Sequence, residues 1–145
     1  MATRSTIALE FADGTVQQIY CHWDGYLEHN GKILQEHYLD PFKVQRLIDL
    51  GSVSSLAPSI DRPEGHSFDK SVDGYTVFYA RDRGEELSVS KFKDYADYRK
   101  RAQGEEYNYI LRNIDGQATW FVEFYGEFDG LLTEAFEFKA MEDAE

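Results

Sequence analysis

The chain is poor in cysteine, proline and basic residues, and it has no long apolar run. A single cysteine among 145 residues, Cys21, excludes an internal disulfide framework and suits a reducing compartment. No apolar run approaches the roughly 18 residues that a membrane-spanning helix needs. Residues 1–6 also lack the apolar stretch of a secretory signal. With ten Phe, ten Tyr and two Trp available for a core, we expect one folded cytoplasmic domain over residues 1–145 and no membrane partner.

Basic residues are few and unevenly placed. Lys and Arg total 15 against 27 Asp and Glu, which gives a formal charge of −12. This charge repels nucleic-acid phosphates, so we expect no direct nucleic-acid partner. Residues 105–145 hold 11 of the acids and two of the bases. They either form a solubilising surface or attract a partner with a basic surface, and Glu123, Glu127 and Asp129 are the candidate contacts.

Two segments have the pattern of β-hairpins. Apolar residues alternate over 6–11, and Asp13-Gly14 fits a type I′ turn into a returning strand over 15–22. The alternation slips between Val16 and Ile19, which indicates a bulge or a shifted turn.

The second hairpin has the same turn chemistry. Asp115-Gly116 separates strands over 107–111 and 118–125. Residues 75–80 alternate as a further, central strand, and 87–89 fit a short one.

Helical patterns fall between the strands. Residues 30–39 fit a first short helix, and Asp40-Pro41 begins a second one that ends at Gly51. Residues 92–102 fit another helix. The last segment either begins a helix at Thr133 or forms a strand over 133–138.

These patterns predict an α+β fold. We expect a mainly antiparallel sheet, built from the two hairpins and the 75–80 strand and covered by the helical hairpin of 30–39 and 41–50. The irregular segment 52–74 is long for a loop in a compact domain, and such loops often carry function.

The residues that most resemble a reactive site lie in 21–38, which holds Cys21 and three of the four histidines. A structural zinc site needs four ligands at short spacing, but His29 and His37 would lie about 12 Å apart along one helix. Cys21 and His22, as neighbours on a strand, point to opposite faces. We therefore expect no metal site.

Catalytic motifs are also missing from the sequence. It has no G-x-S-x-G elbow, no Walker A sequence and no G-x-G-x-x-G, and nothing selects two of the 27 acids as a glycosidase pair. We therefore expect no catalytic residue and no cofactor, which means a protein that is not an enzyme.

Two segments are candidates for recognition. Trp23 and Tyr26 flank Asp24 in a mixture that is typical of ligand cages and of interface hot spots. Arg81 and Arg83 could hold an anion through paired hydrogen bonds. Each has a structural alternative, since the aromatic rings could cover the end of the hairpin and 81–83 could be a self-neutralising turn.

Several strings together resemble a family of small, uncharacterised tailed-bacteriophage and prophage proteins. The most specific is Tyr-Cys-His-Trp-Asp-Gly-Tyr at 20–26, and weaker matches recur in order along nearly the whole chain, at 31–34, 36–38, 48–51, 54–56, 65–68, 81–85 and 106–109. The resemblance implies an accessory phage protein that acts in the cytoplasm of the bacterial host. It implies no reaction and no catalytic residue.

Two functions from different classes follow. The first is a non-catalytic phage protein that binds and inhibits a host protein, such as a nucleic-acid-handling or defence enzyme, through an acidic surface. The alternative is a small-molecule or nucleotide-binding module that uses the 23–26 loop and the 81–83 turn. A structural protein of the virion is a third hypothesis, but the sequence has no obvious assembly elements. The sequence leaves open whether the acidic surface imitates DNA and whether the chain forms oligomers.

Overall fold

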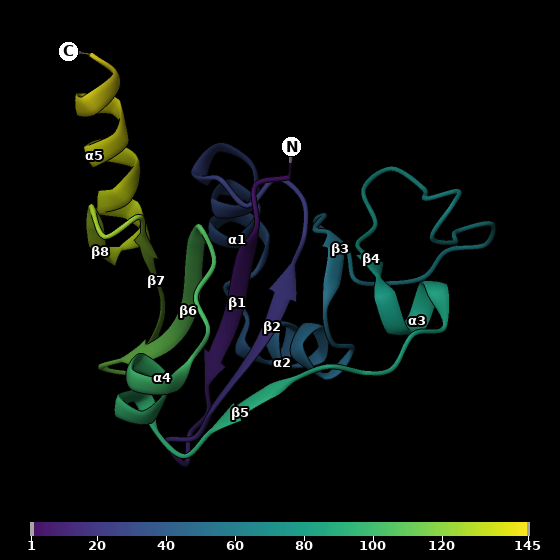
Figure 1. Cartoon of the computed structure of the whole chain (residues 1–145), viewed down its shortest axis with the longest axis horizontal. Helices are drawn as coiled ribbons and strands as arrows, with labels where there is room; N and C mark the ends of the chain where they lie inside the picture. The colour runs from purple at the N-terminus through teal and green to yellow at the C-terminus, as the bar shows by residue number, and fades with distance from the viewer. Residues whose placement is uncertain (1, 145) are drawn as a thin grey trace.

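The protein is a mixed α+β structure built on one eight-stranded, mostly antiparallel sheet (Figure 1). This computed structural model describes residues 2–144. The strand order is β4-β3-β2-β1-β6-β7-β8, and β5 pairs with β2 beside this path. The strands are β1 (Ser5–Glu10), β2 (Val16–Cys21), β3 (Val53–Ser55), β4 (Val77–Phe78), β5 (Ser90–Phe92), β6 (Tyr107–Ile114), β7 (Gln117–Phe124) and β8 (Phe128–Leu131).

Within residues 2–144, five α-helices and one π-helical segment connect the strands. They are η1 (Leu27–Gly31), α1 (Lys32–His37), α2 (Pro41–Asp49), α3 (Tyr79–Arg83), α4 (Tyr95–Arg101) and α5 (Leu132–Asp143). The α+β class and the mostly antiparallel sheet predicted from the sequence are confirmed. No helix in the described part of the chain is long and apolar enough to cross a membrane.

The centre of the sheet is a parallel pair of strands that the sequence did not predict. β1 pairs antiparallel with β2, and β6 pairs antiparallel with β7. Between these pairs β1 and β6 run parallel, from Ser5 beside Tyr107 to Leu9 beside Leu111. A contact across about a hundred residues leaves no local pattern in the sequence.

The main core lies on one face of the sheet. Helices α1, α2 and α5 bury side chains against this face, among them Leu34, Leu47 and Leu132. Ile7 and Val122, from the two hairpins, belong to this same core. The indole N–H of Trp120 donates to the carbonyl of Tyr38 at 2.9 Å, so this buried donor is paired within the core.

A smaller core lies on the opposite face, under α4. It contains Ala8, Val16, Phe92, Tyr98 and Ile110. This second core explains why the alternation slips in β2: Val16 faces the α4 side and Ile19 the main core. The register of β1 with β2 is continuous, from Ser5 beside Cys21 to Glu10 beside Val16, so no bulge is needed.

The two Asp-Gly turns differ, although their sequences suggested one solution. At the second turn both Asp115 (φ 53°) and Gly116 (φ 84°) have positive φ, as a type I′ turn requires. At the first, Gly14 has positive φ but Asp13 does not, and the carboxylate of Asp13 instead accepts from Thr15 N–H at 2.9 Å.

Three predicted elements need correction. The 30–39 helix is a π-helical segment over 27–31 followed by α1, because Gly31 N–H bonds the carbonyl of Tyr26 at 3.4 Å, five residues back. The 75–80 strand was expected at the centre of the sheet, but it is reduced to β4 at the sheet edge, because Tyr79 already begins α3. The 87–89 strand is absent there, and β5 lies at 90–92 instead.

The remaining helices agree better with the sequence. Asp40 caps α2 by accepting from Phe42 N–H at 3.0 Å, and Gly51 follows with φ 84°. The 92–102 helix is the shorter α4. α5 is a helix, so the strand alternative for 133–138 is wrong, and it begins at Leu132 without a side-chain cap from Thr133.

Candidate functional site

The 23–26 segment forms the junction between the first hairpin and η1. Gly25 is required there, because a Cβ on it would lie 2.7 Å from the Cβ of Ser5. Its carbonyl accepts from the hydroxyl of Tyr109 at 2.6 Å. Asp24 has φ 57°, a left-handed conformation that Asp tolerates better than most residues. The backbone of this loop is therefore part of the fold.

Cys21 is a structural group at this junction. Its side chain is fully buried and receives an N–H from Asn30 at 3.3 Å. Burial raises the pKa of the thiol to about 11. A neutral, inaccessible thiol is inert as a nucleophile at neutral pH.

The aromatic side chains of the segment remain partly accessible. Trp23 is 43% exposed and meets the His22 ring edge-on, with centroids 4.8 Å apart. Tyr26 is half-buried against the main core, and the carboxylate of Asp24 raises its pKa. Asp24 and Tyr26 thus lie close together, whereas the ring contacts within residues 2–144 join Trp23 to His22 and Tyr26 to His29.

The predicted 81–83 turn is the helix α3, so that prediction needs correction. Arg81 points into the protein and donates from Nη1 to the carbonyl of Ile60 at 2.6 Å and from Nη2 to that of Thr76 at 3.2 Å. Arg83 stacks on Phe68, 4.7 Å from the ring centroid. No hydrogen bond or ring contact among residues 2–144 joins either arginine to Trp23 or Tyr26.

A buried carboxylate explains why Arg81 turns inward. The Asp82 side chain accepts from Phe78 N–H at 2.8 Å and from Arg81 Nε at 3.0 Å, and it lies 3.5 Å from Nε2 of buried His66. Burial raises the pKa of Asp82, but the hydrogen bonds from Arg81 and Phe78 outweigh it and lower the pKa overall. These charges fasten the 58–76 loop to α3.

Two of the three proposed acidic contacts are engaged within the protein. Asp129 on β8 forms an ion pair with Arg99 of α4. Glu123 on β7 accepts from the amide of Asn108 at 3.0 Å and from Gly126 N–H at 3.2 Å. Glu127, in the β7–β8 turn, is exposed.

A different acidic surface surrounds Tyr125. Tyr125 is 59% exposed, and its hydroxyl donates to Glu106 at 3.4 Å. Burial raises the pKa of the neighbouring Tyr107 to about 12, and the charges of Glu28, Glu106 and Glu127 contribute to the rise. We call Glu28, Glu106, Glu127 and Tyr125 the acidic surface. Sequence reasoning missed it because its members come from three separate segments.

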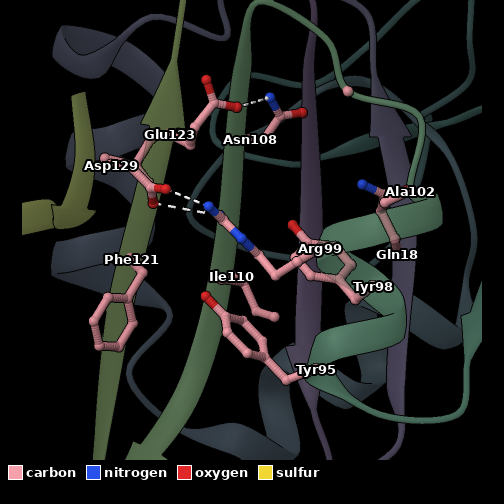
Figure 2. A pocket seen from close by; sticks show the side chains of 12 residues that line it. Gln18, Tyr95, Tyr98, Arg99, Ala102, Asn108, Ile110, Phe121, Glu123 and Asp129 are labelled. Carbon is pink, nitrogen blue, oxygen red and sulfur yellow. Dashed lines mark hydrogen bonds and ion pairs between the residues drawn. The ribbon is translucent and has the colours of Figure 1, made fainter. Parts of the chain in front are cut away.

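A small cavity lies on the α4 side of the sheet (Figure 2). Its volume is about 170 Å³. Tyr95, Tyr98 and Arg99 of α4 line one wall and Phe121 lies across from them, while the polar side chains of Gln18, Asn108, Glu123 and Asp129 complete the lining. Glu123 and Asp129 thus meet in one place, as sequence reasoning grouped them, but they line a cavity.

Metal ligation has no support in this geometry. Within residues 2–144, no cluster of three or more His, Cys, Asp or Glu side chains could hold an ion. His29 is already engaged within the protein, because its Nδ1 lies 2.9 Å from Oδ1 of Asn30.

Comparisons of the chain with protein-family models, with curated proteins and with solved structures find no match.

Proposed function

We propose that this chain is a non-catalytic accessory protein of a bacteriophage, and that it binds and inhibits a host protein in the host cytoplasm through the acidic surface around Tyr125. The observation that carries the proposal is the exposed Tyr125, whose hydroxyl donates to Glu106 and which has Glu127 nearby, while Glu28 lies near the adjacent Tyr107. The phage and host setting rests on the sequence resemblance alone.

The chemistry of this surface suits a basic partner. An exposed tyrosine amid carboxylates can stack on an arginine or lysine side chain while the acids pair with its charge. Tyrosine is also enriched among residues that dominate binding energy. α5 extends the negative charge, because it carries Glu134, Glu137, Glu142 and Asp143 against Lys139.

A partner can reach Tyr125, Glu28 and Glu127, because all three are exposed. The last turns of α5 lie beyond the other elements in Figure 1, at the end of the molecule opposite α3. Asp129 and Glu123, which are already bonded to Arg99 and Asn108, would contribute less.

The alternative small-molecule module at Trp23, Asp24, Tyr26, Arg81 and Arg83 has less support. Arg81 is the group that would bind an anion, but three of its N–H groups already meet Asp82 and backbone carbonyls. Freeing it would break the contacts that hold the 58–76 loop.

The proposal can be tested by quantitative affinity capture from a bacterial lysate with three tagged proteins. These are the wild type, the variant Glu28→Gln/Glu106→Gln/Glu127→Gln, and a matched control, Glu64→Gln/Asp69→Asn/Glu86→Gln. The control removes the same three charges at exposed positions elsewhere in the chain.

We expect a basic protein that the wild type and the control recover equally, and that the acidic-surface variant loses at least ten-fold. If all three recover the same proteins in the same amounts, or if none recovers a basic protein, the proposed function is wrong.

A further inference from the structure

The α4 cavity contains a buried polar group that the protein leaves unpaired. Gln18 of β2 is 6% exposed, and its Nε2 has no hydrogen-bond partner among residues 2–144. Figure 2 shows this nitrogen turned toward the same space as the hydroxyl of Tyr98. Native proteins pair nearly all buried amide N–H groups, so an unpaired one that borders a cavity indicates a missing acceptor.

The side chain of Asn108 is not free to supply that acceptor. Asn108 is nearest in kind, but its Oδ1 already accepts from Thr6 Oγ1 at 2.9 Å and from Glu105 N–H at 2.8 Å. Its Nδ2 donates to the carbonyl of Glu105 and to Glu123. Turning Asn108 toward Gln18 would break several bonds to make one, so the Gln18 amide remains available to a molecule in the cavity.

The segment after α4 covers Gln18 and separates two hollows. Ala102 and Gly104 line the first cavity, whereas Gln103 and Glu105 line a second one of about 140 Å³, and Gln18 lines both. Asn108 holds this segment through its two bonds to the backbone of Glu105.

The charges of the cavity limit what can occupy it. The lining carries two carboxylates, Glu123 and Asp129, and one guanidinium, Arg99. A simple anion would face both acids, and a simple cation would face the arginine. A molecule with one group of each sign can exchange with the Arg99–Asp129 pair without leaving either charge alone.

The volume of the cavity also indicates a small ligand. The volume of about 170 Å³ is smaller than the roughly 300–1,000 Å³ of sites for drug-sized ligands and holds about five or six waters. Burial raises the pKa of Tyr98, which keeps its phenol protonated as a donor at neutral pH.

We propose that this cavity binds a small molecule that carries an ammonium group and a carboxylate or amide carbonyl, the chemistry of a free amino acid or its amide. The ammonium lies toward Asp129 and Glu123. The carbonyl or carboxylate accepts from Gln18 and Tyr98 and meets Arg99. This site is separate from the acidic surface and does not depend on the proposed function.

The test is a titration of the full chain with each of the twenty L-amino acids, followed by calorimetry and by ¹⁵N–¹H NMR. Acetate, ethylamine and adenosine serve as single-group and ring-bearing comparisons. We expect saturable one-to-one binding of at least one amino acid, with shifts of the Gln18 side-chain amide and of the backbone of 102–104. Acetate and ethylamine alone should bind at least ten-fold more weakly.

Variants distinguish this site from non-specific binding. Gln18→Leu and Tyr98→Phe should each weaken binding about ten-fold or more, and Tyr98→Phe keeps the ring if the first variant fails to fold. Gln45→Leu, the same change at an exposed position of α2, should leave binding unchanged. The proposal is overturned if no amino acid binds saturably, if adenosine alone does, or if a crystal structure grown with the amino acid shows only ordered water beside Gln18.

Discussion

At the α3 end of the molecule, charged groups are held inside the fold, whereas at the β8–α5 end most of them stay in solvent. The Asp82 carboxylate binds Arg81 and the backbone N–H of Phe78, and Arg81 also donates to the carbonyl of Ile60. Around Tyr125, Glu28 and Glu127 are exposed. The difference separates charges that stabilise the structure from charges that are available to a partner.

The largest effect on stability should come from the buried carboxylate. Asp82→Ala removes the acceptor for Phe78 N–H and leaves Arg81 without its anion, so the free energy of unfolding should fall by about 3–5 kcal/mol. Urea denaturation measures the loss. Glu85→Ala, which removes a solvent-exposed partner of Arg83, should cost less than about 1 kcal/mol. Equal losses for the two variants would contradict the comparison.

Acid should weaken the contacts at the α3 end. Because the pKa of Asp82 is lowered in the folded protein, its contribution to stability is full above the unfolded pKa of about 3.9 and is lost as the pH falls through the folded value. Unfolding followed from pH 7 to pH 2 should therefore show a steeper loss for the wild type than for Asp82→Asn. Parallel curves would mean that Asp82 does not carry this dependence.

The 23–26 segment should behave as part of the fold through Gly25 more than through Trp23. Gly25→Ala places a methyl group 2.7 Å from Ser5 and should cost about 1–3 kcal/mol. Trp23→Ala should cost less than the roughly 3–5 kcal/mol of a fully buried tryptophan, because the ring is 43% exposed. Thermal or urea unfolding of both variants gives the order. A larger loss of stability for Trp23→Ala than for Gly25→Ala would contradict this prediction.

The smallest effect on stability should come from the acidic surface. Replacing Glu28, Glu106 and Glu127 with Gln should change the free energy of unfolding by no more than about 1 kcal/mol in total, since Glu28 and Glu127 are exposed and Gln at position 106 keeps an oxygen that accepts from Tyr125. Relief of mutual repulsion could even stabilise the variant slightly. A loss comparable to that of Asp82→Ala would show that these acids are structural.

The sequence predicted what local chemistry determines. Asp40-Pro41 and Gly51 set the two ends of α2, because a cap acceptor, a proline and a positive φ act over a few residues. The alternation over 6–11 likewise located β1. By contrast, the parallel pairing of β1 with β6 and the helix α3 depend on contacts between distant segments, and the sequence did not predict them.

The candidate sites also divide into features that are local in the sequence and features that only the fold creates. Arg81 looked available in the sequence, but its environment is made by Ile60, Thr76 and Asp82, which only the tertiary structure brings together. Gln18 gave no sign of function, because a polar residue that alternates with Ile19 is ordinary on a half-exposed strand. It became notable once α4 covered that face. The sequence showed that acidic residues are concentrated near the C-terminus. It did not show that the exposed Tyr125 lies among some of them.

The most direct test of the central claim is the association rate constant of the captured basic partner as a function of salt. For the wild type and the Glu64→Gln/Asp69→Asn/Glu86→Gln control, the rate should fall steeply between 0.05 and 0.5 M salt, as the Debye length falls from roughly 14 to about 4 Å. For Glu28→Gln/Glu106→Gln/Glu127→Gln the rate should already be low and nearly independent of salt. The same steep dependence in all three proteins would contradict the account.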